Sequence, residues 1–121
     1  MIEINIKPLS VNRAWKGRRY KTDDYKSFEQ EFYYKLPKLE IPEGKLKVSY
    51  VVGYKNKASD IDNFVKVTTD LLQKKYGFND NMIYELNIIK EVGDEFIKFK
   101  IESYERQANR DIQESKNKSL Q

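Results

Sequence analysis

The chain contains no cysteine and no histidine. Without cysteine it has neither a disulfide scaffold nor a thiolate zinc site. Without histidine it lacks the commonest general base and the commonest transition-metal ligand of proteins. Any chemistry must therefore depend on carboxylates, amines and hydroxyls, or on a hard cation held by oxygen atoms.

Long apolar runs are also missing from the sequence. No stretch approaches the roughly 20 residues that a membrane-spanning helix needs. Met1 leads directly into an alternating strand pattern, so we find no signal peptide. We therefore expect a protein that is not in a membrane and that works in the cytoplasm.

The excess charge is positive. The 121 residues include 23 lysines and arginines against 19 aspartates and glutamates, which gives a formal net charge of +4. The isoelectric point is about 9.1. This length suits one domain with a hydrophobic core. A basic chain favours an anionic partner such as nucleic acid, although the excess is modest.

The spacing of apolar residues predicts the secondary structure. Period-two alternation indicates strands, and apolar residues three and four apart indicate helices. A stretch without either period, dense in charge, indicates a loop. We expect strands at 2–7, 45–54, 82–91 and 95–104, helices at 22–36 and 60–76, and a loop at 9–21.

Local signals mark the ends of these elements. Thr22 or Asp23 can cap the first helix, and Gly77 stops the second. Gly93-Asp94 suits a tight hairpin turn between the last two strands. The order βαβαββ predicts an α+β fold, a single domain at 1–104 with two helices on one face of a small mixed or antiparallel sheet. Residues 105–121 are nearly devoid of large apolar side chains, and we expect a polar, flexible tail.

Three aspartates frame the second predicted helix. Asp60 and Asp62 open it in the string SDIDN, and Asp80 follows it in GFNDN. Clusters of carboxylates are how proteins hold Mg²⁺, the usual agent for cutting phosphate esters. In a chain that is otherwise basic, this pattern favours a metal-dependent nuclease if the three carboxylates converge.

Each acid also has a simpler interpretation. Asp60 suits an N-cap at the strand-to-helix junction, and Asp80 suits an ordinary turn. Asp62 weakens this account, because one cap needs one oxygen. A second acid two positions later repels the first unless a cation or an amine lies between them.

Lys66 and Asp70 continue the spacing of four that begins at Asp62, so the three side chains share one stripe of the helix. They can form an exposed ladder of ion pairs worth about 0.3–0.5 kcal/mol per pair. Alternatively, the Lys66 ammonium lies beside a metal-bound phosphate and stabilises its developing charge. The spacing alone does not separate these two roles.

The string Asp60-x-Asp62-Asn63-x-x-Lys66-x-x-x-Asp70, followed by Gly77-Phe78-Asn79-Asp80, resembles the RusA family of Holliday junction resolvases. These are small endodeoxyribonucleases, often carried by phages and prophages. The N-terminal half is also similar, with a strand that ends in proline, an asparagine at Asn12, an aromatic and basic loop and a helix. The similarity covers nearly the whole chain except the tail. One departure is Asn79, where relatives commonly carry an acid.

The resemblance implies Mg²⁺-dependent hydrolysis of phosphodiesters in branched DNA, without an organic cofactor. By position, Asp60, Asp62 and Asp80 correspond to the metal ligands of the family. Lys66 corresponds to its functionally important lysine. Asn63 and Asp70 also match the motif, and we expect them to support the ligands. The family forms homodimers, which suit paired cuts with one site per subunit.

The charged loop is the natural DNA contact if the resemblance holds. Its cations can meet phosphates, and its aromatic side chains can stack on exposed bases. The alternative is a solvated loop whose aromatic side chains fold back onto the core. The expected DNA-binding residues are Asn12, Arg13, Trp15, Lys16, Arg18, Arg19 and Lys21 in the loop, with Lys55 and Lys57 near Asp60.

Three rival functions stay open at this point. One is a Mg²⁺ nuclease that cuts flaps, forks or other branches rather than four-way junctions. Another is a non-catalytic DNA-binding module whose acids are caps and turn residues. The third is an RNA nuclease.

Overall fold

The protein is described by a computed structural model, which covers residues 1–16 and 20–105. Of the predicted tail, residues 106–121 lie outside the described residues. The elements are β1 (Ile2–Ile4), α1 (Val11–Ala14), β2 (Trp15–Lys16), β3 (Tyr20–Lys21), α2 (Asp23–Lys35), β4 (Leu46–Tyr54), α3 (Val65–Tyr76), a 3₁₀ turn η1 (Asp80–Met82), β5 (Ile83–Val92) and β6 (Phe96–Ser103).

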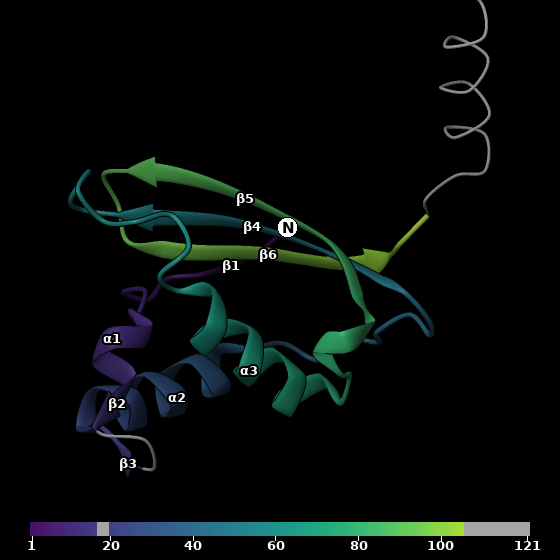
Figure 1. The fold of residues 1–121 in the computed structure, drawn as a ribbon, viewed down its shortest axis with the longest axis horizontal. Helices are drawn as coiled ribbons and strands as arrows, with labels where there is room; N and C mark the ends of the chain where they lie inside the picture. The colour runs from purple at the N-terminus through teal and green to yellow at the C-terminus, as the bar shows by residue number, and fades with distance from the viewer. Residues whose placement is uncertain (17–19, 106–121) are drawn as a thin grey trace, which may run out of the picture.

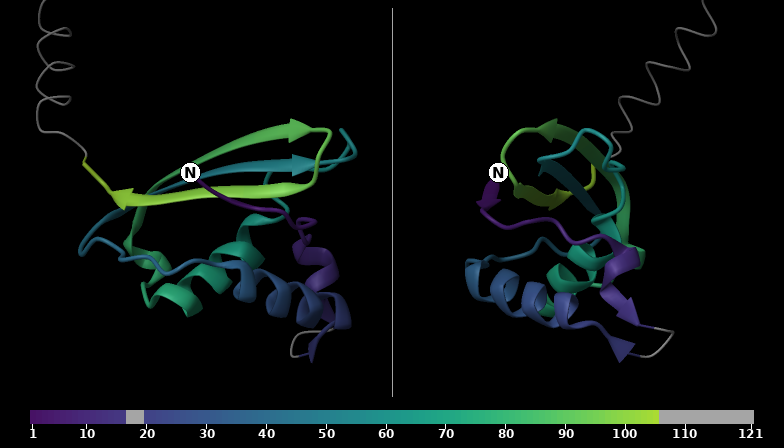
Figure 2. Two further views of the ribbon diagram at one scale, coloured as in Figure 1. Left: turned by 180° about the vertical axis from the view of Figure 1, so that it is seen from behind. Right: turned by 90° about the vertical axis from the view of Figure 1, so that its left-hand side faces the viewer.

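The architecture is two layers, a sheet and a set of helices on one of its faces (Figure 1). The four-stranded sheet has the order β1-β6-β4-β5. β4 pairs parallel with β5 and antiparallel with β6, and β1 pairs antiparallel with β6. The views in Figure 2 show α1, α2 and α3 on the same side of this sheet. The predicted α+β class and mixed sheet are confirmed.

The predicted hairpin between the last two strands is wrong. β5 and β6 both pair with β4, so β4 lies between them. The connection at 93–95 therefore crosses the end of β4 instead of making a tight turn between neighbours. It is attached there by a hydrogen bond from the Gly93 N–H to the Tyr54 carbonyl, at 2.8 Å.

Gly53 makes this crossing possible. A Cβ added at Gly53 would lie 2.3 Å from the Asp94 carbonyl oxygen and 2.4 Å from the Phe96 ring. Cβ contacts that short do not occur, and the first of these atoms belongs to the backbone, which cannot rotate away. The absence of a side chain at one position of β4 thus lets the chain pass from β5 to β6.

The region predicted as a loop at 9–21 contains short elements. The helix α1 occupies 11–14, and β2 and β3 pair in a two-residue antiparallel ladder. The Thr22 N–H donates to the Ala14 carbonyl at 3.0 Å, which closes this segment, and Ala14 is fully buried. One helical turn gives too few residues for a visible period, so the sequence pattern missed it.

The helix α2 follows its prediction closely. Thr22 is the N-cap, and its hydroxyl accepts the Tyr25 N–H at 3.1 Å. Tyr25, Phe28 and Phe32 are buried against the sheet, as their helical spacing indicated. The last residue of the predicted stripe, Leu36, is also buried and forms the C-cap.

The helix α3 begins five residues later than predicted, at Val65. Residue 64 is the N-cap and makes no side-chain hydrogen bond, so Asp60 does not cap the helix. The start is fixed by packing instead, because the fully buried Phe64 ring meets the Tyr50 ring edge-on at 5.1 Å. Asp60 and Asp62 consequently lie in the turn that precedes α3. Gly77 ends α3 with a left-handed φ of 74°.

Among the described residues, no helix is both long enough and apolar enough to span a bilayer. What positions the site is the unit β4-α3-β5, in which two parallel strands are joined through a helix that packs on them. The Tyr50 hydroxyl on β4 and the Thr69 hydroxyl on α3 share a buried hydrogen bond of 2.7 Å. This bond fixes the helix above the sheet.

Candidate active-site groove

An open groove of about 520 Å³ runs between α3 and β5. One wall carries polar side chains of the turn and of α3, and the other carries side chains of β5. Asp80, from η1, lies at the junction of the walls. The lining residues include Asp62, Lys66, Thr69, Asp70 and Asp80 together with Ile83, Tyr84, Leu86 and Ile88.

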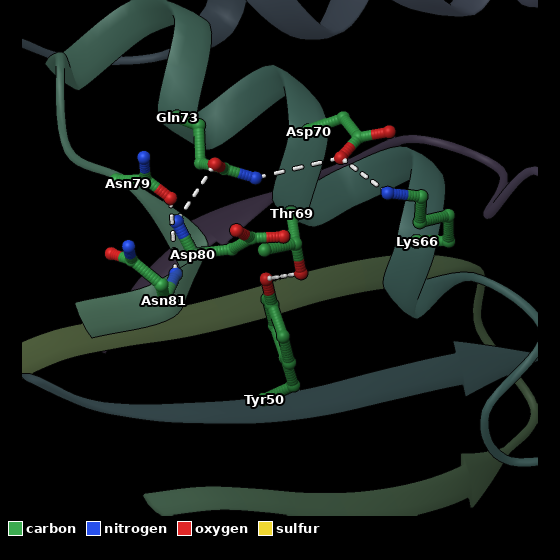
Figure 3. A network of polar contacts seen from close by, with 8 residues as sticks. All are labelled: Tyr50, Lys66, Thr69, Asp70, Gln73, Asn79, Asp80 and Asn81. Atoms are coloured by element: carbon green, nitrogen blue, oxygen red, sulfur yellow. Dashed lines mark hydrogen bonds and ion pairs between the residues drawn. The ribbon is translucent and has the colours of Figure 1, made fainter. Parts of the chain in front are cut away.

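The helical wall contains a chain of polar contacts (Figure 3). The Lys66 ammonium lies 3.2 Å from a carboxylate oxygen of Asp70. The same carboxylate accepts a hydrogen bond from the Gln73 amide at 3.4 Å. The Asp70 carboxylate therefore already has two partners within the protein. This fits the expected role of a side chain that orients its neighbours. Of the predicted ladder, this 66–70 pair has formed.

Asp80 is held by its backbone rather than by its side chain. Its N–H donates to the Gln73 amide oxygen at 2.9 Å. Asn79 caps the 3₁₀ turn, because its amide oxygen accepts the Asn81 N–H at 3.1 Å. In Figure 3 the Asp80 carboxylate extends toward α3. Gln73 thus links the position of Asp80 to the carboxylate of Asp70.

The sequence patterns did not single out Gln73. The signal that would have found it is its position one turn after Asp70, where the two side chains face each other on a helix. The cap at Asn79 also explains the departure from two adjacent acids. A neutral amide oxygen accepts the same backbone N–H as a carboxylate would.

Asp60 and Asp62 lie beyond the end of β4, close to Tyr54. Tyr54 is buried and its hydroxyl finds no hydrogen-bond partner among the described residues. Burial chiefly, and then the negative charges of Asp62 and Asp60, raise the pKa of Tyr54 to about 12. The hydroxyl therefore keeps its proton to a higher pH than an exposed tyrosine does.

A lysine on β5 holds the loop that leads to this turn. The Lys90 ammonium donates to the backbone carbonyls of both Lys57 and Ser59. On the other side, the Asn63 carbonyl accepts the Val11 N–H of α1 at 3.0 Å. The turn from 60 to 64 is thus fixed at both ends, while Asp60 and Asp62 themselves are exposed.

The two acids of the turn are not in the same surroundings. Asp62 lines the groove, whereas Asp60 does not. On the far side of the turn, Asn63 lines a second, larger cavity of about 740 Å³. Tyr54, Arg13 and Lys55 line that cavity too. The acidic turn therefore separates two concave surfaces, one toward β5 and one toward α1 and α2.

A family model described as Endodeoxyribonuclease RusA matches residues 6–103. The match covers most of the chain and includes both walls of the groove and the acidic turn. The chain belongs to the RusA family. A search of curated proteins gives no match.

RusA proteins are endodeoxyribonucleases that resolve Holliday junctions, so this chain is a nuclease of a family that acts on branched DNA. RusA nucleases generally depend on a divalent metal. Carboxylate oxygens are the right donors for such an ion. Among the described residues, nothing donates a hydrogen bond to the carboxylates of Asp60, Asp62 and Asp80 or forms an ion pair with them. These oxygens are open to an external ligand.

A single metal site would require the carboxylates of Asp60, Asp62 and Asp80 to lie close together. In the part of the chain that the structure describes, no three acidic side chains lie close enough together to hold one metal ion. Asp62 and Asp80 share the groove with Lys66, and Asp60 stands outside it. That the RusA motif of this chain assembles a three-carboxylate metal site therefore stays a prediction.

The predicted DNA-binding residues of this RusA chain have different surroundings. Arg13 and Lys55 line the second cavity, although Lys55 also lies 3.6 Å from a carboxylate oxygen of Glu95. Lys21 pairs with Glu29 at 3.0 Å. Asn12 and Lys57 are exposed. Arg18 and Arg19, and the side chains of Trp15 and Lys16, lie outside the described residues.

Proposed function

We propose that this RusA-family chain resolves Holliday junctions by Mg²⁺-dependent hydrolysis of phosphodiesters, acting as a homodimer in the cytoplasm. The observation that carries the proposal is the groove between α3 and β5. It collects Asp62, Lys66 and Asp80, three of the positions that match the family motif, into one concave surface. If these acids served only as helix caps and turn residues, they would not need to line the same groove.

In the proposed mechanism, Asp60, Asp62 and Asp80 would hold the cation. When bound, Mg²⁺ supplies Lewis acidity toward the scissile phosphate and lowers the pKa of a water. Lys66 approaches the developing negative charge from the helical wall, and its pairing with Asp70 sets the direction of its ammonium group. Like charges repel, so a cation also offsets the cost of bringing three carboxylates together.

The remaining residues serve the DNA. Arg13 and Lys55 lie across the acidic turn from the groove, where they can bind phosphates of the strands that lead to the cutting site. Asn63 lines the same cavity and supports the turn through its backbone. Two subunits related by a twofold axis would present two such sites to opposite strands of a junction.

Close rivals are cutting of flaps or forks in place of four-way junctions, cutting of RNA, and binding without cutting. Cleavage gels on a four-way DNA junction, a flap, a fork and an RNA hairpin separate the first two, with and without Mg²⁺. The proposal expects paired cuts in the four-way junction that require the cation. Cleavage restricted to simpler branches or to RNA would overturn it, and so would no cleavage of any substrate.

The Asp62→Asn variant tests the chemistry of the groove. We expect at least a 100-fold loss of Mg²⁺-dependent cleavage, with junction binding kept or improved because less negative charge faces the phosphate. Asp94→Asn is the matched control, since Asp94 is an exposed acid in the connection between β5 and β6. It should cut like the parent. Full activity in Asp62→Asn would make the acids of the turn structural.

A further inference from the structure

The β5 wall of the groove carries exposed apolar side chains and one acid, Glu85. Tyr84 is 56 % exposed and Leu86 is 45 % exposed, and both line the groove. Leu86 and Ile88 are paired in register with Val48 and Tyr50, which face the helices. Neighbouring residues in register point to the same face of a sheet. Leu86 and Ile88 therefore project to the helical side and stand beside α3. Tyr84 lines the same groove at the point where the register between β4 and β5 shifts.

The opposite wall is charged. Asp62, Lys66 and Asp70 line it, and the Lys66 side chain is 65 % exposed. A groove with one apolar wall and one charged wall suits a ligand with the same division. A partner protein that covered the apolar side would also have to cover these charged groups without releasing them to water, which is unfavourable. A nucleotide has a flat apolar base, which suits the β5 side chains, joined to an anionic phosphate, which suits the exposed Lys66 ammonium.

Tyr84 is held in place by its neighbours. Its ring stacks on the Tyr104 ring, with centroids 5.7 Å apart and planes 30° from parallel. The Lys45 ammonium lies 4.8 Å from the centre of the Tyr84 ring. The Tyr104 N–H donates to the Lys45 carbonyl at 2.8 Å, so all three residues are joined near the end of the groove. A rigid aromatic group with a nearby cation is what single-stranded nucleic acid stacks on.

We propose that Tyr84 and Leu86 form a base-binding subsite, which takes an unpaired nucleotide next to the phosphate that is cut. This rests on the proposed function, because the phosphate is placed at the acids of the same groove. The base lies against the β5 wall, and Lys45 contacts the backbone phosphate that follows. The volume of about 520 Å³ falls in the range of about 300–1,000 Å³ that small-molecule sites occupy.

The subsite would make the protein bind branched DNA in preference to a continuous duplex. In a continuous duplex every base is stacked and paired, and taking one out costs a few kcal/mol. At a branch point the bases are already partly unstacked, so the same contact costs less. Tyr84 is then a specificity-determining residue, distinct from the acids that act on the phosphate.

Photo-crosslinking tests the contact directly. A four-way DNA junction carries 5-iododeoxyuridine at one branch-point position at a time, and it is bound to the full chain with Asp80→Asn, which should bind without cutting. The crosslinked peptide is then identified by mass spectrometry. The proposal expects a crosslink to Tyr84 from a nucleotide next to the cleavage position. Crosslinks only to other residues, or none at any branch-point position, would overturn it.

A double-mutant cycle measures the energy of the contact. Replacing the branch-point nucleotide by an abasic one should weaken binding about 5- to 150-fold, the usual effect of one base–aromatic stack. Tyr84→Ala should weaken binding similarly and should no longer distinguish the two junctions. Additive losses would overturn the proposal, because they show that Tyr84 and the base act independently.

Two matched controls accompany the cycle. Ile89→Ala removes an apolar side chain on the same strand that is 59 % exposed but paired with Val51 on the other face. Tyr34→Ala removes a tyrosine that is 89 % exposed on α2. Neither should change the preference for the intact junction. Sedimentation of Tyr84→Ala tests the other occupant, since a shift from dimer to monomer with unchanged base preference would make this wall a subunit interface and overturn the subsite.

The outcomes separate this proposal from the proposed function. Cleavage by the parent chain tests the nuclease activity, while the crosslink and the cycle use a protein that need not cut. Cleavage without a Tyr84 crosslink would remove only the subsite. A Tyr84 crosslink without any cleavage would leave a binding module that holds an unpaired base.

Discussion

The acidic side chains of the groove differ in whether their carboxylates already have a partner within the protein. Asp70 has two partners, Lys66 and Gln73, whereas the carboxylate of Asp80 meets neither an ion-pair partner nor a hydrogen-bond donor among the described residues. Sequence spacing found Asp80 and Lys66 because the family motif includes them. Helical spacing could have paired Gln73 with Asp70, but its contact with the Asp80 N–H depends on a chain reversal that no local pattern encodes.

Gln73 should act by positioning Asp80. Gln73→Leu removes both the acceptor of the Asp80 N–H and the donor to Asp70. Substituting a residue that orients a metal ligand typically lowers activity or metal affinity about 10- to 100-fold. We expect a loss of that size in cleavage, with a higher Mg²⁺ concentration at half-maximal rate. Gln30→Leu, at an exposed position of α2, is the control and should cut normally.

Tyr54 should make stability sensitive to alkaline pH. Burial raises its pKa to about 12, above the value of about 10 in an unfolded chain. The folded state therefore keeps this proton after the unfolded state has lost it, so the stabilisation is complete below pH 10 and is lost between about pH 10 and 12. We expect Tyr54→Phe to flatten the fall in unfolding free energy across that range, as urea titrations would measure. Tyr34→Phe, on the exposed side of α2, should leave the slope unchanged.

Among the elements, the position of a strand in the sequence was easier to predict than the strand with which it pairs in the sheet. Alternation located β4, β5 and β6 closely, because period two is a local property. Which strand pairs with which is not local, and the predicted hairpin was wrong because β4 separates β5 from β6. The start of α3 was wrong for a related reason. A cap at Asp60 was plausible from residue type, but burial of Phe64 under the sheet decided where the helix begins.

Gly53→Ala tests the crossing between β5 and β6. A methyl group there would contact the Asp94 backbone and the Phe96 ring at impossible distances, so the connection must shift. We expect a loss of about 1–3 kcal/mol or more in unfolding free energy, the range for overpacking. Gly44→Ala is the control, because its added methyl group meets no atom within 4 Å. Its positive φ of 85° gives it a cost of strain only, which should be the smaller of the two. Equal losses would show that the crossing tolerates a side chain.

For the whole molecule, charge sets how the protein meets DNA. The net charge of +4 is small, so affinity must come from local groups rather than from a strong overall field. The acidic turn lies between two concave surfaces. The one toward α1 is lined by cations such as Arg13 and Lys55 and also by the acids Asp24, Glu31 and Glu95. The sequence indicated which residues carry charge, but their arrangement around the turn depends on tertiary contacts such as the bond between Val11 and Asn63.

Arg13→Ala should weaken binding to every branched DNA by a similar factor. Each lost phosphate contact reduces the slope of log affinity against log salt concentration by about 1. We expect that change when junction binding is measured from low to physiological salt. Lys38→Ala, an exposed cation outside both cavities, should leave the slope unchanged. An unchanged slope in Arg13→Ala would place the DNA away from the second cavity.

The Lys90 ammonium fixes the loop before the acidic turn, so a chemical change to that amine would alter the loop. One amine donates to two backbone carbonyls, and it comes from a strand some 30 positions further along the chain. Acetylation of that amine would cancel its charge and leave it a single N–H to donate. A small covalent mark on β5 would then release the segment that carries Asp60 and Asp62, without touching either acid.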